Sequence, residues 1–129
     1  MKRYKVYTKE RGLVETDKYD DFSGLTWHRE DGPAFTRYRK NGNIEREEYC
    51  INDRRHRLDG PAAISYYANG LIECEEYWRN DRLHRLDGPA DIAYNENGNN
   101  VSSNYWINGS FCTKENYHTE LLKLKVQSL

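Results

Sequence analysis

The sequence predicts an all-β fold, an elongated antiparallel sheet of stacked β-hairpins that a helix caps at the C-terminus. A heptad of the form His-Arg-x-Asp-Gly-Pro-Ala begins at His28, His56 and His84, a spacing of 28 residues. An Asn-Gly pair and then an Asn-Asp or Asn-Gly pair follow each heptad at constant offsets. A fixed period of this length is typical of repeat architectures, in which one supersecondary unit stacks on copies of itself.

The 129 residues fit one repeat domain with three parts. We expect a degenerate entry unit at 1–27, three repeats at 28–111 and a C-terminal helix cap at 112–129. A degenerate end unit is expected because the outermost repeat of a stack has one face without a neighbour.

In the entry unit, turn residues stand where the repeats have their Asn-Gly pairs. Arg11-Gly12 takes the first turn and Ser23-Gly24 takes the second. Tyr19 takes the position of the strand tyrosine between them.

In each full repeat the residues after the heptad alternate, as in Ala62, Ile64 and Tyr66. A period of two predicts a strand with one buried face. The pair Asn69-Gly70 favours a two-residue hairpin turn of a primed type. In the heptad itself, aspartate before Gly-Pro can close a turn on its own backbone, and proline begins the next strand.

The C-terminal segment changes to a helical pattern. Thr113 is a candidate N-cap, and Tyr117, Leu121 and Leu124 follow at helical spacing. We expect a helix at about 114–126 that folds back over the last hairpin and covers an open edge or face of the sheet.

The composition indicates a thin, polar fold with a small core. Hydrophobic residues make up 36% of the chain and charged residues 32%, while 13% are aromatic, including eleven tyrosines. This aromatic content argues against disorder. The net charge of -1, with acids and bases interspersed, does not favour nucleic-acid binding. No segment is long enough to span a membrane, and with Cys50, Cys74 and Cys112 read as reduced thiols we expect a cytoplasmic protein.

The repeat pattern resembles a known family. Asn-Gly, Tyr-Trp-x-Asn-Gly and His-Arg-x-Asp-Gly-Pro-Ala over about residues 25–126 are similar to the MORN-like hairpin repeats of bacteriophages and large DNA viruses. Glu30, Asp53, Asp81 and Cys112 depart from that pattern. The resemblance implies a β-hairpin stack and a viral origin, hence the host cytoplasm. It implies no catalytic residue, because such repeats mostly bind and scaffold.

The three heptads could suggest a metal site or a hydrolase, but the spacing argues against both. Equivalent residues of successive hairpins lie roughly 10 to 14 Å apart, whereas metal ligands must lie within about 2.3 Å of one ion. We therefore predict no metal, no cofactor and no enzyme, and rank a phosphodiesterase as a third hypothesis. In a structural interpretation the arginines bridge to Glu48 or Glu76, and the histidines and aspartates hold turns.

The favoured functional hypothesis is a protein-binding module, a phage accessory protein that binds and inhibits a host defence protein. The alternative is a protein that sequesters a nucleotide or another small anion, with a homodimer formed through open sheet edges as one arrangement. The candidate binding residues combine bidentate donors with aromatic rings. They are His28, Arg29, His56, Arg57, His84, Arg85, Tyr49, Tyr77, Tyr105, Trp78 and Trp106.

Overall fold

A computed structural model describes residues 2–128 and consists of one large antiparallel sheet, two smaller strand pairs and one α-helix. The elements in chain order are β1 (Tyr4–Thr8), β2 (Gly12–Thr16), the 3₁₀ helix η1 (Tyr19–Phe22), β3 (Phe35–Tyr38), β4 (Ile44–Glu48), β5 (Cys50–Ile51), β6 (Arg54–Arg55), β7 (Ala63–Tyr66), β8 (Ile72–Glu76), β9 (Trp78–Arg79), β10 (Arg82–Leu83), β11 (Asp91–Tyr94), β12 (Asn100–Ile107), β13 (Ser110–Cys112) and α1 (Lys114–Gln127).

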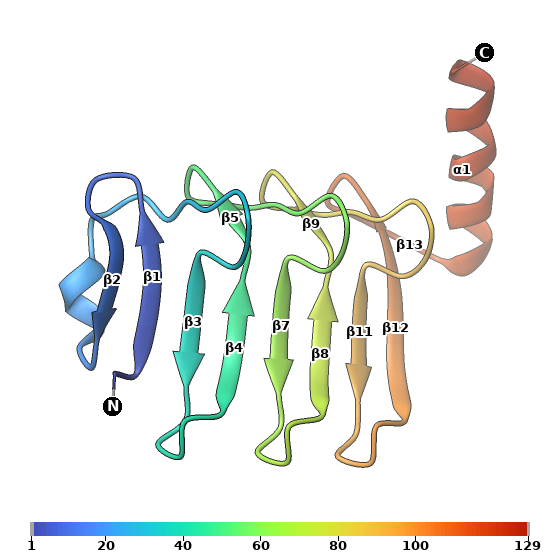
Figure 1. Ribbon diagram of the computed structural model, residues 1–129. Coiled ribbons are helices and arrows are strands. Elements are labelled where there is room, and N and C mark those ends of the chain that lie inside the picture. Colours follow the sequence, from blue (N-terminus) through green and yellow to red (C-terminus); the bar gives the residue numbers. More distant parts are fainter. Residues whose placement is uncertain (1, 129) are drawn as a thin grey trace.

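The large sheet has nine strands in the order β13-β12-β11-β8-β7-β4-β3-β1-β2. Figure 1 shows the hairpins β3–β4, β7–β8 and β11–β12 side by side, with the short strand pairs and the heptad loops at one end of the sheet. Consecutive hairpins also pair with each other, as β4 does with β7 and β8 with β11. The predicted all-β fold, its antiparallel sheet and its C-terminal helix are confirmed.

The first turn of each hairpin is not the two-residue primed turn that the sequence predicts. In the turn between β3 and β4, the N–H of Arg39 donates to the carbonyl of Asn43, and the N–H of Gly42 donates to the carbonyl of Arg39. Gly42 has a positive φ of 94°, whereas Asn41 has none. This is a three-residue loop that ends on a left-handed glycine. The side chain of Asn41 accepts from the N–H of Asn43 and fixes the loop.

The primed turns lie at the second Asn pair of each unit. Asn52 and Asp53, between β5 and β6, both have positive φ, 51° and 67°. A type I′ turn needs this conformation at both central residues, and asparagine and aspartate tolerate it better than most residues. Oδ1 of Asp53 also accepts from the N–H of Trp27 at 2.6 Å. Aspartate therefore suits the second position of this turn.

The entry unit differs from the one that the sequence predicts. Tyr19 is not a strand tyrosine, because it lies in η1 and is 55% exposed. Tyr7 takes that role: its N–H donates to the carbonyl of Ala34 and its carbonyl accepts from the N–H of His28. Tyr49 and Tyr77 make the same pair of contacts in later units. The segment 9–26 is an insertion between Tyr7 and the first heptad.

The hydrophobic core is concentrated at the N-terminal end of the sheet. Val6, Val14, Phe22 and Phe35 form one buried cluster, and Trp27 packs against it with its ring stacked 4.7 Å from that of Phe35. Beyond this cluster the buried side chains are mainly small, chiefly alanines, with Tyr117 of the C-terminal helix as the large exception. The later hairpins must therefore depend largely on hydrogen bonds, ion pairs and half-buried rings.

Helix α1 begins as predicted but does not fold back over the sheet. The side chain of Thr113 caps it by accepting from the N–H of Asn116. Tyr117 is its buried residue, whereas Leu122 and Val126 are 63% and 69% exposed. Figure 1 shows α1 standing away from the end of the sheet beyond β13. Of the expected apolar stripe, Tyr117 packs against the array, on the ring of Tyr105, whereas Leu124 stays 38% exposed.

Candidate functional site

Each heptad forms a loop that its own arginine holds together. In the second loop, Nε of Arg57 donates to Oδ1 of Asp59 at 3.0 Å, and Nη1 donates to the carbonyl of Pro61 at 3.1 Å. The guanidinium lies over the ring of Tyr49, 4.0 Å from its centroid, as a cation–π contact. A β-carbon at Gly60 would lie 2.9 Å from Cζ of Arg57, so the close approach of the arginine favours glycine there.

The first and third loops repeat this set of contacts. The partners of Arg29 are Asp31, Pro33 and Tyr7, and those of Arg85 are Asp87, Pro89 and Tyr77. Nε and Nη1 of all three arginines are therefore occupied by intramolecular contacts.

The expected bridge from these arginines to Glu48 or Glu76 is wrong, since the aspartate of the same loop is closer at hand. Arg46 contacts both glutamates instead, at 3.3 and 3.2 Å.

The histidines hold the second turns, as predicted. Nδ1 of each accepts a hydrogen bond from the backbone N–H of the asparagine in the following turn. The pairs are His28 with Asn52 at 3.1 Å, His56 with Asn80 at 3.1 Å and His84 with Asn108 at 2.9 Å. Because Nδ1 accepts, this nitrogen carries no proton, and the opposite ring nitrogen, Nε2, is left for other contacts.

The three tyrosines lie where the long strands meet the terminal hairpins, and each has a ring face covered. Arginines cover Tyr49 and Tyr77, whereas the ring of Tyr105 lies 4.6 Å from that of Tyr117 in α1. The hydroxyl of Tyr117 donates to the carbonyl of Arg85 at 2.6 Å. No heptad, and so no heptad arginine, follows Tyr105. Tyr117 covers the ring of Tyr105 instead and docks the helix on the last unit.

Trp78 and Trp106 line a groove of about 420 Å³ between neighbouring terminal hairpins. Trp78 lies under the guanidinium of Arg55 at 3.9 Å. Nε1 of Trp106 donates to Oδ2 of Asp91 at 3.1 Å, whereas Nε1 of Trp78 is buried without a partner among the described residues. The difference follows from sequence, because alanine stands at position 63 where the next repeat has Asp91.

Two grooves run between the heptad loops. We call the first groove the one between loops 28–34 and 56–62, of about 580 Å³, and the second groove the one between 56–62 and 84–90, of about 370 Å³. Leu58 and Leu86 line them and are 69% and 44% exposed. They occupy the same heptad position, where the first loop has Glu30.

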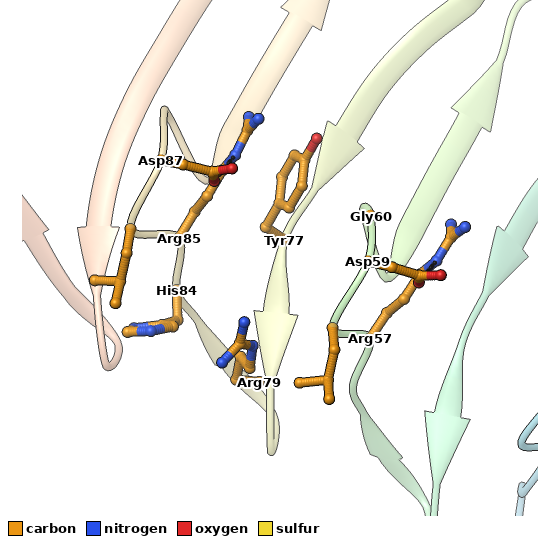
Figure 2. Close-up of a pocket in the computed structure, with 10 residues that line it drawn as sticks. Arg57, Asp59, Gly60, Tyr77, Arg79, His84, Arg85 and Asp87 are labelled. Carbon is orange, nitrogen blue, oxygen red and sulfur yellow. Dashed lines mark hydrogen bonds and ion pairs between the residues drawn. The ribbon is translucent and has the colours of Figure 1, made fainter.

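The second groove also contains a cation without a partner. Figure 2 shows Arg79 of β9 pointing into the gap between the second and third loops, beside His84. Within residues 2–128 the Arg79 side chain makes no hydrogen bond or ion pair. Burial, and secondarily the charge of Arg79, lower the pKa of His84 below its ordinary value. This groove therefore offers a free guanidinium beside a neutral imidazole.

A scan against models of protein families found no match. Searches of curated proteins and of solved structures also found none. Within residues 2–128, no helix is long and apolar enough to cross a membrane, and no group of three or more His, Cys, Asp or Glu side chains is placed to hold a metal ion.

The cysteines are not bonded to one another. Burial, followed by the negative charge of Glu48, raises the pKa of the Cys50 thiol to about 12. At neutral pH this thiol is protonated and 2% exposed, which is unsuited to a nucleophile.

Several of the predicted site residues line the two grooves: Arg29, Tyr49, His56, Arg57, Tyr77, His84 and Arg85. His28 and Tyr105 lie outside the lining of both grooves, and Trp78 and Trp106 line the separate groove between the terminal hairpins.

Sequence reasoning missed Leu58, Leu86 and Arg79. A departure from the repeat was the available signal for Arg79, because the corresponding positions hold Ile51 and Ile107.

Acidification is expected to weaken the third unit through His84. The unfolded chain takes up the histidine proton at about pH 6.5, whereas the folded chain resists protonation, so stability falls as the pH drops below about 6.5. The measurement is the urea midpoint between about pH 7.5 and 5.5, for the wild type and for His84→Asn. Asparagine can accept the same hydrogen bond without titrating. A variant with the same pH slope as the wild type would contradict the assignment.

Proposed function

We propose that the chain is a non-enzymatic protein-binding module and that the heptad loops with their two grooves form its binding face. The observation that carries the proposal is the pair of exposed leucines, Leu58 and Leu86, held at equivalent positions on successive loops. Large apolar side chains that stand together in water are a feature of interaction surfaces.

The loops that present these leucines are braced before any partner arrives. Each has its arginine stacked on a tyrosine, paired with an aspartate and bonded to a proline carbonyl, as Arg57 is in the second loop. A surface that is already ordered loses less entropy on binding, which favours affinity. Tyrosine and arginine lining the grooves are residue types enriched in interfaces.

The partner that we propose is a host protein, and the effect is its inhibition within antiviral defence. This part of the proposal rests on the resemblance to viral MORN-like repeats and not on the geometry. The geometry supports a partner segment that spans both grooves and reaches Leu58 and Leu86 together.

The test is an affinity pulldown from bacterial lysate with the tagged protein and with Leu58→Asp/Leu86→Asp. A specific host protein should copurify with the wild type and be lost with the double variant. Leu13→Asp is the matched control, because Leu13 is a 45% exposed leucine in β2, far along the sheet from the second groove. If the double variant retained every partner of the wild type, the heptad loops would not be the binding face.

A second candidate function is binding of a small anion in the second groove, favoured by the unpartnered Arg79 beside His84. Nucleotides should then raise the melting temperature of the wild type but not of Arg79→Gln. Arg54→Gln, which removes an exposed arginine outside the lining of both grooves, should keep the shift. Equal shifts in all three proteins, or none in the wild type, would exclude this site.

A further inference from the structure

One edge of the large sheet is open. Residues 100–104 of β12 pair with β11 on their inner side, whereas β13 covers only Tyr105–Ile107 on the outer side. The corresponding segments of β4 and β8 have a strand on both sides. Within the described residues, the outer side of 100–104 has no strand partner.

The other edge strand, β2, has η1 of the entry unit beside it. Figure 1 shows the segment that contains η1 on the outer side of β2. Phe22 of η1 is 1% exposed and packs into the N-terminal core, which anchors that segment. The N-terminal end of the sheet therefore has a packed segment beside its last strand, whereas residues 100–104 at the C-terminal edge have no strand partner within the described residues.

The inner strands of this sheet are charged and the open edge strand is not, which is the reverse of the arrangement that protects a sheet edge. Sheets usually carry charged side chains on edge strands, which discourages pairing with other chains. Here the inner strands carry the charges, with the sequences Ile-Glu-Arg-Glu-Glu at 44–48 and Ile-Glu-Cys-Glu-Glu at 72–76. The open segment at 100–104 reads Asn-Val-Ser-Ser-Asn and has no charge. The last unit therefore lacks charged side chains on the open edge, where such charges would prevent association.

We propose that the open edge of β12 pairs with β12 of a second copy of this chain, antiparallel about a two-fold axis, to form one continuous sheet. Centred on Ser102, this register places Asn100 opposite Asn104 and Val101 opposite Ser103 of the second copy. These pairs are neutral. A two-fold contact uses the same surface on both copies, so the strand must be complementary to itself.

The lack of charge favours a second copy over a foreign strand. In the same register the sequence of β8 would place Glu73 opposite Glu75, and like charges directly opposite each other destabilise a strand pair. A strand of another protein could place lysine or arginine opposite such glutamates, whereas a second copy of the same strand would place glutamate there. Self-pairing is the case that requires the edge to be neutral.

Helix α1 leaves this segment free. Its buried residue, Tyr117, lies on Tyr105, just beyond the open residues. The heptad loops extend from the end of the sheet where the terminal hairpins lie, so dimerisation through β12 does not depend on what the two grooves bind (Figure 1).

The test is sedimentation velocity of the full chain and of Val101→Glu/Ser103→Glu. This variant restores the glutamates that β8 has at the same positions, so the fold should tolerate it. The wild type should shift from one chain to two as its concentration rises, and the variant should dimerise at least about tenfold more weakly. A monomeric wild type at every concentration, or a variant that dimerises equally well, would overturn the proposal.

A charge exchange separates loss of the contact from loss of the fold. Val101→Lys/Ser103→Lys should also be monomeric alone, and a mixture of the lysine and glutamate variants should form a heterodimer because opposite charges then face each other. If the mixture stayed monomeric while both variants kept wild-type far-UV spectra, β12 would not be the contact. If a foreign protein bound only the wild-type edge and the pure chain stayed monomeric, self-pairing would be wrong.

Discussion

Replacing Phe22 by alanine is expected to lower the free energy of unfolding by about 4 kcal/mol, the largest loss that we expect from a single substitution in this chain. Phe22 is 1% exposed and makes edge contacts with the rings of Tyr4, Tyr19, Trp27 and Phe35. Removal of its ring leaves a cavity in the apolar cluster at the N-terminal end of the sheet, and few neighbours are free to fill it. Guanidinium unfolding, followed by tryptophan fluorescence, measures the loss.

Phe111→Ala is the matched control. Phe111 is 59% exposed in β13, and its ring contacts that of Trp106 edge to face. The same chemical change should cost about 1 kcal/mol or less there. In Phe22→Ala, hydrogen exchange should accelerate first in β1–β3, because units of a stack contact only their neighbours. Equal losses in the two variants would contradict a core located at the N-terminal end.

The strands and the helix could be predicted because each boundary has its own local signal. The alternation Ala62, Ile64, Tyr66 leads into β7, and Thr113 caps α1, as the structure has it. These signals act within a few residues and do not depend on the rest of the fold. A repeated heptad then made the stacking order the simplest arrangement.

The entry unit could not be predicted in the same way, since its insertion breaks the register. His56 follows Tyr49 by seven positions, whereas His28 follows Tyr7 by twenty-one. Alignment by spacing therefore selected Tyr19. The decisive contacts are backbone hydrogen bonds between distant segments, which leave no mark on the residue types.

The predictions of the turn types and of the ion-pair partners were wrong for a related reason. Asn41-Gly42 and Asn108-Gly109 are the same pair in sequence, yet only the second has both residues at positive φ. The pairing of the two flanking strands decides which conformation the turn adopts. The partner of Arg57 is likewise chosen by the path of its own loop, which places Asp59 within 3.0 Å of Nε.

Arg57→Ala is expected to lower the free energy of unfolding by about 3 kcal/mol, although the residue lies in a surface loop. The substitution removes the cation–π contact on Tyr49 and the donors to Asp59 and Pro61 together. It also leaves an empty space beside Gly60, whose backbone lies against the guanidinium. Arg57→Lys should recover little of the loss, because an ammonium group cannot reach both acceptors and lie flat on the ring.

Arg79→Ala supplies the comparison in the same groove. Arg79 is exposed, and within residues 2–128 it has no hydrogen bond or ion pair, so its loss should leave the urea midpoint almost unchanged. The two substitutions should therefore have different effects: Arg57→Ala should lower stability, and Arg79→Ala should affect only anion binding. If Arg57→Ala were as stable as Arg79→Ala, the contacts of the heptad arginine would not hold the loop. Arg29, Arg57 and Arg85 would then again be candidates for binding a ligand.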